Sequence, residues 1–181
     1  FPYTTLFRSG LIVSEDWKKF PRLAFALGVS SSIHAANVLD LGCSDGFISI
    51  PLAQAGYKVD GVDLDPRCVA LANERADRLA PNAHFTEGNI ESVAEWADCE
   101  KFYKYDLAIL FETIEHVVNP APLLDKVERV AKHVAITTPF LAWEQGNTNW
   151  SKRELKGHLR IFDLVDIEML LGQRGTIHNL Y

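Results

Sequence analysis

The chain has 181 residues and a formal net charge of −6, with 48% apolar and 23% charged residues. This composition is typical of one globular domain and excludes a collagen-like, coiled-coil or intrinsically disordered chain. No apolar run approaches the roughly 18 residues that a membrane-spanning helix needs. The negative net charge is also unlike the positive charge that is typical of nucleic-acid-binding proteins. The three cysteines are odd in number and widely spaced, so they predict neither a disulfide framework nor a zinc site, and a reducing cytoplasm is the expected location.

The start of the chain does not read like native protein. Residues 1–9 look like a translated sequencing adapter, and they show neither the charged start nor the apolar core of a signal peptide. We therefore expect them to lie outside the fold. The remainder divides into an N-terminal helical segment over residues 10–36 and an α/β domain over residues 37–181.

From residue 14 onward, the apolar pattern alternates between helical and strand periodicity. The predicted helices cover 14–28, 45–55, 66–79, 90–96, 120–131 and 163–171, and the predicted strands cover 38–41, 58–62, 84–86, 105–111, 134–137 and 176–180. Such alternation requires right-handed crossovers and a parallel sheet covered on both faces. The predicted fold class is therefore α/β, a doubly wound and mostly parallel sheet, in which ligands bind beyond the carboxyl ends of the strands.

The end of the first predicted strand has the composition of a ligand-binding turn. Gly42 and Gly46 allow close approach of the backbone, and the following helix offers unpaired N–H groups. A dinucleotide fingerprint fails here, because Ser44 occupies its second glycine position. Asp40 would repel a pyrophosphate but favour a cationic ligand, unless it only caps its own turn. Cys43 is expected mainly as a packing residue whose backbone lines the turn.

Further candidate cofactor contacts follow the next strands. Asp63 comes 21 residues after Gly42, where a carboxylate can accept two hydrogen bonds from a ribose diol. Asn89 follows the third strand, and its amide could read the edge of an adenine or simply cap a helix. Leu64 and Ile90 adjoin these two residues, and Phe111 ends the fourth strand, so we expect all three beside the same ligand.

These motifs, in this order, resemble the class I S-adenosylmethionine (SAM) dependent methyltransferases over about residues 11–181. The first motif of that family, D/E-x-G-x-G-x-G, is matched by Asp40, Gly42 and Gly46, with Ser44 in place of the middle glycine. This substitution implies that residue 44 does not need a positive φ. Because the family finishes its sheet with an antiparallel strand pair, the resemblance also implies a domain that is incomplete at its C-terminal end.

The resemblance implies SAM as cofactor. Asp40 would lie near its cationic groups, Asp63 would hold the ribose hydroxyls and Asn89 the adenine. The expected activity is methyl transfer to a small-molecule acceptor, with oxygen as the preferred acceptor atom. SAM supplies the reactive methyl group, and the protein must position a nucleophile and accept its proton.

The fourth strand is followed by Glu112, Glu115 and His116, and the run from Glu115 to Pro120 is similar to the E-H-x-x-D-P motif of the ubiquinone-type O-methyltransferase group. If these residues form one helical turn, their side chains share one face. That face could orient the following helix, or His116 could be the general base. It could also bind a metal with His158, as in metal-dependent small-RNA 2'-O-methyltransferases. We assign His116 and Glu115 as catalytic and assign no metal.

Residues 152–160 carry a local charge of +3 and precede the last predicted helix. They are either a solvated face or a site that holds an anionic acceptor. Three other functions stay open, namely a non-catalytic SAM-binding or protein-interaction domain of the same fold, a metal-dependent RNA 2'-O-methyltransferase and an NAD-dependent oxidoreductase. We expect no membrane partner and no nucleic-acid partner, and the sequence does not fix the oligomeric state.

Overall fold

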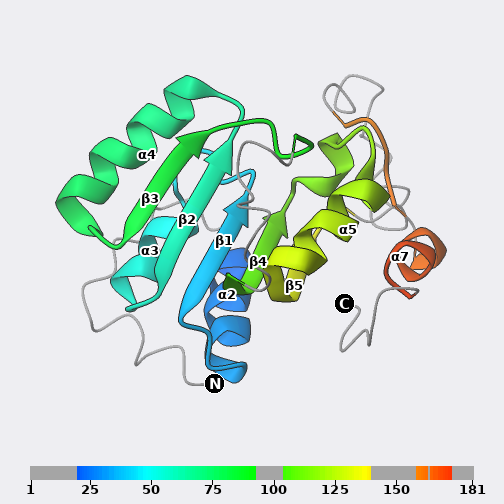
Figure 1. Cartoon of the computed structure of the whole chain (residues 1–181), viewed down its shortest axis with the longest axis horizontal. Coiled ribbons are helices and arrows are strands. Elements are labelled where there is room, and N and C mark those ends of the chain that lie inside the picture. Colours follow the sequence, from blue (N-terminus) through cyan, green and yellow to red (C-terminus); the bar gives the residue numbers. More distant parts are fainter. Residues whose placement is uncertain (1–19, 93–103, 140–157, 163, 173–181) are drawn as a thin grey trace.

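A computed structural model of the chain describes residues 20–92, 104–139, 158–162 and 164–172. Its centre is a five-stranded sheet in the order β3-β2-β1-β4-β5, in which all neighbouring strands are parallel (Figure 1). The strands are β1 (Asn37–Leu41), β2 (Lys58–Asp63), β3 (Ala83–Glu87), β4 (Tyr105–Phe111) and β5 (Ala131–Thr137). The strand order reverses between β1 and β4, which makes the carboxyl ends of these two strands the expected ligand site.

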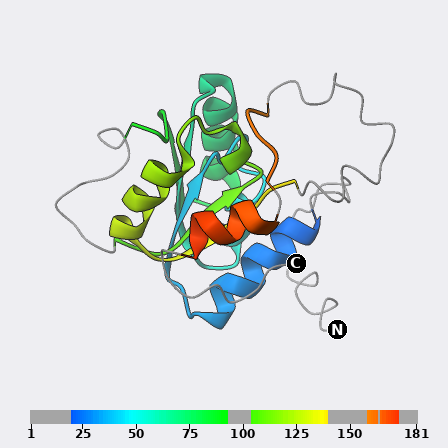
Figure 2. The same ribbon diagram turned by 90° about the vertical axis from the view of Figure 1, so that its right-hand side faces the viewer.

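Helices cover both faces of this sheet, as the sequence predicts. They are α2 (Phe20–Ser32), α3 (Ser49–Gln54), α4 (Pro66–Leu79), the 3-10 turn η4 (Ile114–His116), α5 (Pro120–Val130) and α7 (Leu164–Leu171). Viewed along the sheet, α5 lies on one side and α2 on the other (Figure 2). This arrangement confirms the predicted doubly wound α/β class.

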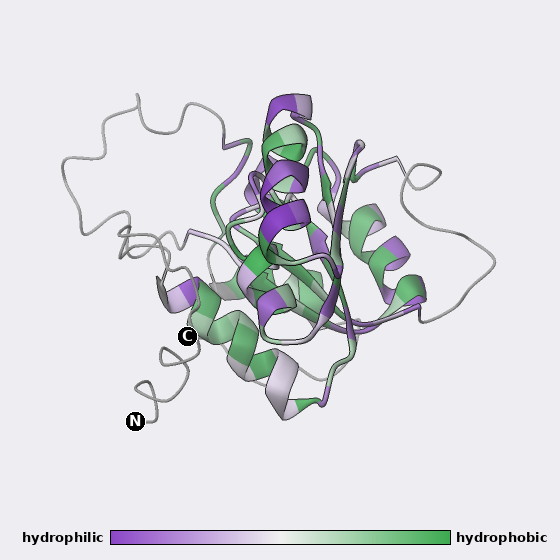
Figure 3. Cartoon of the chain, turned by 90° about the vertical axis from the view of Figure 1, so that its left-hand side faces the viewer, coloured by the Kyte–Doolittle hydropathy of each residue, from purple (hydrophilic) through white to green (hydrophobic). Residues whose placement is uncertain are grey.

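The core follows from the alternation of side chains along the strands. Val38, Leu107 and Ile109 pack in one cluster with residues of α2, α3 and α4, whereas Leu39 and Leu110 pack in a second cluster with α5. Of the covering helices, α4 and α5 are amphipathic, and α4 combines hydrophilic and hydrophobic stretches in Figure 3. Residue 40 lies between Leu39 and Leu41, so its side chain faces the first cluster, on the side of α3.

Several element boundaries differ from the prediction. The helix after β1 begins at Ser49 instead of residue 45, because Ser44 and Gly46 both adopt positive φ, which an α-helix cannot accommodate. The first described helix does not end at Gly28 but continues to Ser32. Residues 90 and 91 form a turn, so the helix predicted over residues 90–96 does not begin there.

Some predictions concern residues outside those described. They include the adapter-like residues 1–9, the start of the first helix at 14–19, residues 93–96 and the strand at 176–180. Among the described helices, none has both the length and the apolar character that crossing a membrane requires.

Candidate active site

The turn after β1 has the left-handed backbone expected of a ligand-binding loop. Gly42, Ser44 and Gly46 have φ values of +85°, +49° and +78°. A Cβ atom at Gly42 would lie 2.5 Å from Oγ1 of Thr113, so glycine is required both by the backbone and by the close approach of the β4 end. The expectation that residue 44 needs no positive φ is wrong. Its backbone N–H donates a hydrogen bond to Oδ2 of Asp63 at 2.7 Å, which holds the serine in that conformation.

Asp40 lies beneath this turn and is 4% exposed. The hydroxyl of Ser49, in the first turn of α3, donates a 2.6 Å hydrogen bond to its Oδ2 atom. Burial raises the pKa of Asp40 to about 7, the Ser49 hydrogen bond partly opposes this rise, and the negative charge of Asp63 adds to it. A cation at this end of β1 would stabilise the carboxylate form. Nothing in the local sequence pattern marks Ser49 as the partner of Asp40.

Asp63 joins the ends of the first three strands. Its Oδ1 atom accepts a hydrogen bond from the N–H of Asp65 at 2.9 Å, while Oδ2 accepts from Ser44. Its carbonyl oxygen accepts from the N–H of Gly88, just after β3, at 2.9 Å. Leu64 is 69% exposed beside it, although leucine side chains are usually buried. The carboxylate and an accessible apolar surface therefore adjoin at the carboxyl edge of the sheet.

The other predicted cofactor residues have different surroundings. Oδ1 of Asn89 accepts a hydrogen bond from the N–H of Glu91 at 2.9 Å, so its carbonyl group shapes the turn after β3. Ile90 packs against the cluster beneath α5, and Phe111 is buried and stacks on Phe25 of α2, with the ring centroids 5.6 Å apart. The structure thus places Ile90 and Phe111 in the packing around the carboxyl ends of the strands, and their contact with a cofactor stays a prediction.

Cys43 fits the packing role that the sequence predicts. Its side chain is buried, and its Sγ atom would lie 2.9 Å from a Cβ atom built at Gly61. Burial is the main cause that raises the pKa of the Cys43 thiol, and the charges of Asp40 and Asp63 act in the same direction. The thiol is therefore protonated at neutral pH and is not an activated nucleophile.

Glu112 does not share a face with Glu115 and His116. The 3-10 turn covers only residues 114–116, and Glu112 precedes it with a φ of +53°. Its Oε1 atom accepts a 2.9 Å hydrogen bond from Thr137 of β5, and its Oε2 atom lies 3.9 Å from Nη1 of Arg22 of α2. The helical spacing assumed from the sequence fails because the left-handed residue breaks the turn before it can form.

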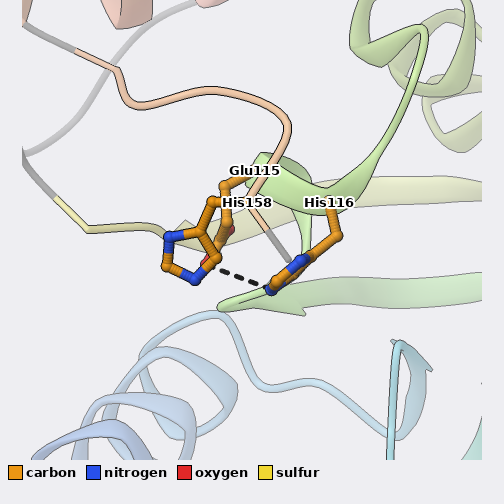
Figure 4. A group of neighbouring side chains, drawn as sticks. All are labelled: Glu115, His116 and His158. Atoms are coloured by element: carbon orange, nitrogen blue, oxygen red, sulfur yellow. Dashed lines mark ion pairs between the residues drawn. The ribbon is translucent and has the colours of Figure 1, made fainter. Parts of the chain in front are cut away.

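The side chain of His158 lies beside those of Glu115 and His116 (Figure 4). The N–H of Leu159 donates a 2.9 Å hydrogen bond to the carbonyl of Glu115, which brings residue 158 to the loop. The rings of His116 and His158 meet edge to face, with centroids 4.8 Å apart. Potential metal-ligating atoms of the three side chains all lie within 4.8 Å of one another.

Glu115 is the buried member of this group, with 1% exposure, while the side chain of His116 is 45% exposed. Oε2 of Glu115 accepts a 3.2 Å hydrogen bond from Thr138, and Oε1 lies 3.9 Å from Nε2 of His116. Burial is the main cause that raises the pKa of Glu115. Within the described part of the chain, Oε1 of Glu115 and Nδ1 of His158 are buried without a hydrogen-bond partner.

The +3 segment is represented in the structure only by its last residues. The guanidinium Nη2 of Arg160 donates a 2.8 Å hydrogen bond to the carbonyl of Val118, so this arginine holds the loop after His116. The other basic residues of the segment, Lys152, Arg153 and Lys156, lie outside the described residues. The prediction of an anion site there stays a prediction.

A parallel sheet of this order, with a glycine turn after β1 and an acid at the end of β2, is typical of Rossmann-like nucleoside-binding folds. Residues 13–176 match the family model described as "Methyltransferase domain", and the chain belongs to this family. The match confirms the predicted methyltransferase class, its fold and SAM as its cofactor.

The curated relatives are longer proteins. The O-antigen chain terminator bifunctional methyltransferase/kinase WbdD of Escherichia coli is 34% identical over 131 residues, which are 70% of this chain and 17% of that protein. The ubiquinone biosynthesis O-methyltransferase of Azorhizobium caulinodans is 30% identical over 82 residues, 45% of this chain and 30% of that protein. Among solved structures, the plantazolicin methyltransferase BpumL in complex with SAH has a TM-score of 0.69 at 19% identity, covering 87% of this chain and 64% of that one.

Proposed function

We propose that this chain transfers the methyl group of SAM to an oxygen atom of a small-molecule acceptor. The observation that carries the proposal is the arrangement of two carboxylates around one glycine turn, in a chain that belongs to the methyltransferase domain family. Asp40 is buried beneath the turn, where a cation is the favoured counter-charge, and Asp63 fixes the backbone of the turn at Ser44. The names of the ubiquinone-type relatives support oxygen as the acceptor atom.

In this proposal, the ends of β2 and β3 hold the nucleoside. Carboxylate oxygens have enough lone pairs to accept a ribose hydroxyl while they keep a backbone N–H, so Asp63 can serve both. Asn89, whose carbonyl oxygen accepts from Glu91, would lie beside the adenine. The exposed side chain of Leu64 would cover the base.

His116 is the proposed general base. When SAM supplies the methyl group, the acceptor hydroxyl must lose a proton as its oxygen attacks, and the exposed imidazole of His116 can accept that proton. Oε1 of Glu115 lies 3.9 Å from the imidazole Nε2 atom, and its negative charge would stabilise the imidazolium that forms. His116→Ala is therefore expected to lower turnover by about 10²–10⁴-fold and to leave SAM affinity within about twofold.

Calorimetry and product detection test this proposal together. The chain should bind SAM and its demethylated product SAH, and NAD should not bind, because Asp40 opposes a pyrophosphate. A panel of phenols, sugars and phosphate esters, assayed by SAH formation and by mass of the methylated product, should contain an acceptor. SAH binding without any product across the panel would favour the non-catalytic alternative, and tight NAD binding would contradict the cofactor assignment.

A second candidate mechanism uses a metal, and the unpartnered buried atoms favour it. Two imidazoles and one carboxylate form a donor set that suits Zn²⁺, Mn²⁺ or Co²⁺. Oε1 of Glu115 and Nδ1 of His158 are such donors. A divalent ion bound there would polarise the acceptor oxygen. The RNA acceptor of this alternative is disfavoured by the net charge of −6.

Chelation separates the two mechanisms. In the metal mechanism, EDTA abolishes turnover, Mn²⁺ or Co²⁺ restores it, and His158→Ala lowers turnover as much as His116→Ala, because each variant removes one imidazole ligand. In the general-base mechanism, turnover survives EDTA and His158→Ala has the smaller effect. Titration of the protein with Co²⁺, followed by its visible absorption, gives the same answer without an acceptor.

Three finer features of the proposal concern partners and location. We propose an anionic acceptor, which the +3 charge of residues 152–160 supports, and competition by phosphate tests it. We propose a cytoplasmic location, which the absence of a disulfide-like cysteine spacing supports, and cell fractionation tests it. The third feature is that the acceptor is a small molecule, and the proposal specifies no oligomeric state for the protein.

A further inference from the structure

The turn after β3 and the loop that carries His116 are joined by one side chain, that of Glu91. Its two carboxylate oxygens accept hydrogen bonds from consecutive backbone N–H groups, Oε1 from Val118 at 2.9 Å and Oε2 from Asn119 at 3.0 Å. Its carbonyl oxygen accepts a third, from Nζ of Lys126 of α5, at 2.7 Å. Glu91 therefore binds both the loop before α5 and the helix itself.

This contact places a carboxylate at the N-terminus of α5, a helix that has no side-chain cap of its own. Asn119 is the N-cap residue, but its side chain makes no capping hydrogen bond, and Pro120 at the first helical position has no N–H. A carboxylate at a helix N-terminus satisfies unpaired donors and interacts favourably with the helix dipole. Here that carboxylate comes from the turn after β3, 28 residues before Asn119 in the sequence.

The other end of the contact is the proposed cofactor site. The N–H of Glu91 donates to the side chain of Asn89, and Gly88 at the start of the same turn donates to the carbonyl of Asp63. The position of Glu91 thus depends on the two residues proposed to hold the adenine and the ribose. A cofactor bound there would fix this turn from the opposite side.

The loop held by Glu91 also carries the catalytic candidates. Val118 is two residues after His116, and its carbonyl accepts from Arg160 at 2.8 Å, while the carbonyl of Glu115 accepts from Leu159 at 2.9 Å. The loop is therefore fixed by Glu91 on one side and by residues 158–160 on the other. These two attachments set where His116 meets His158.

We propose that Glu91 is a positioning residue that couples the cofactor-binding turn to His116. The inference rests on the proposed function, and it adds the connection between the two halves of the site. Displacement of a reacting group by about 1 Å can cost about 10²-fold in rate. A carboxylate that fixes the His116 loop relative to the cofactor turn therefore acts on turnover, although it touches neither methyl donor nor acceptor.

Glu91→Gln tests this inference with little change in size. The amide keeps one acceptor but turns an NH₂ group towards the second backbone N–H, so the loop must move. We expect kcat to fall at least tenfold, with the SAH dissociation constant changing less than threefold. Glu91→Asp keeps both acceptor oxygens on a shorter stem and should recover part of the loss.

Asp106→Asn is the matched control. Oδ2 of Asp106 also accepts from two consecutive backbone N–H groups, those of Ala36 at 2.9 Å and Asn37 at 3.1 Å, but at the amino ends of the strands. This variant should lose stability without losing kcat per folded molecule. If Glu91→Gln lowers activity only in proportion to the folded fraction, as the control does, its role is structural and the inference fails.

Nuclear magnetic resonance gives a readout that needs no acceptor. In the wild-type protein, SAH should shift the ring signals of His116, because the cofactor turn and the histidine loop are joined. In Glu91→Gln, SAH should still bind but leave these signals where they were. An unchanged SAH-induced shift in the variant would overturn the inference alone, whereas a wild-type protein that does not bind SAH would overturn the proposed function as well.

Discussion

The buried carboxyl group of Asp40 makes a prediction that links pH, stability and cofactor binding. Its pKa is raised from 3.8 to about 7 in the folded protein. Between these two pH values, the folded state holds a proton that the unfolded state has lost, so the free energy of unfolding falls as pH rises. A difference of this size corresponds to about 4 kcal/mol, lost progressively from about pH 4 to pH 7.

The Asp40→Asn variant isolates this effect. It cannot ionise, and its amide oxygen can still accept the hydrogen bond from Ser49. We therefore expect the variant to be more stable than the wild type by up to about 4 kcal/mol at pH 8, with the difference vanishing towards pH 4. Urea unfolding followed by circular dichroism at several pH values measures it. Asp106→Asn is the control, because hydrogen bonds to Lys132 and to backbone N–H groups lower the pKa of Asp106 to about 2, so its titration lies outside this range.

Without a ligand, burial favours the protonated form of Asp40, and binding of a cation should favour its carboxylate form instead. The positive groups of SAM favour the carboxylate, so binding near pH 6 should release close to one proton, and binding at pH 8.5 should release almost none. Calorimetry in buffers with different ionisation enthalpies counts these protons. Equal pH dependence of stability in wild type and Asp40→Asn, or binding at pH 6 without proton release, would refute the reasoning.

Two further predictions concern the same turn. Asp63→Ala should weaken SAH binding by roughly 1.5–3 kcal/mol in calorimetry. Asp60→Ala, which removes a carboxylate from the first half of β2, should not change it. Equal affinities for the parent and Asp63→Ala would remove Asp63 from the cofactor site. Gly42→Ala should lower the free energy of unfolding by roughly 1–3 kcal/mol, because its φ is +85° and its Cβ would lie 2.5 Å from Thr113. Gly28→Ala should instead stabilise α2 by about 0.4–1 kcal/mol, since a Cβ there meets nothing within 4 Å. Urea unfolding measures both variants, and a Gly42→Ala variant more stable than the Gly28→Ala variant would contradict these predictions.

Hydrophobic periodicity predicts the central strand β4 best, because it is buried on both faces, whereas the edge strands β3 and β5 are partly exposed and their predicted bounds, 84–86 and 134–137, are shorter than the observed ones. Residues 107–111 alternate between the two core clusters, and the predicted strand 105–111 has the same bounds as β4. The predicted bounds of helix 66–79 also agree with those of α4, because Asp65 caps the helix and Pro66 occupies its first turn. Local signals of this kind fix an element regardless of its neighbours.

The errors lie where contacts between distant residues decide the backbone. Ser44 takes a positive φ because Asp63, on another strand, accepts its N–H. Glu112 leaves the face of Glu115 and His116, and its carboxylate instead contacts Thr137 and Arg22. These partners lie on other elements, so a spacing rule applied to one segment cannot predict them. An i, i+3, i+4 pattern at the end of a strand is therefore weak evidence that the side chains share a face.

The same reasoning explains why the sequence did not reveal Glu91. It lies within the predicted helix 90–96, and its partners Val118 and Asn119 contribute backbone N–H groups, which have no side-chain signature. A doubly wound sheet brings successive strand ends to one edge, so loops far apart in sequence become neighbours there. Residues that join those loops can therefore be recognised only after the strand order is known, even when the residues that bind the ligand are evident from their motifs.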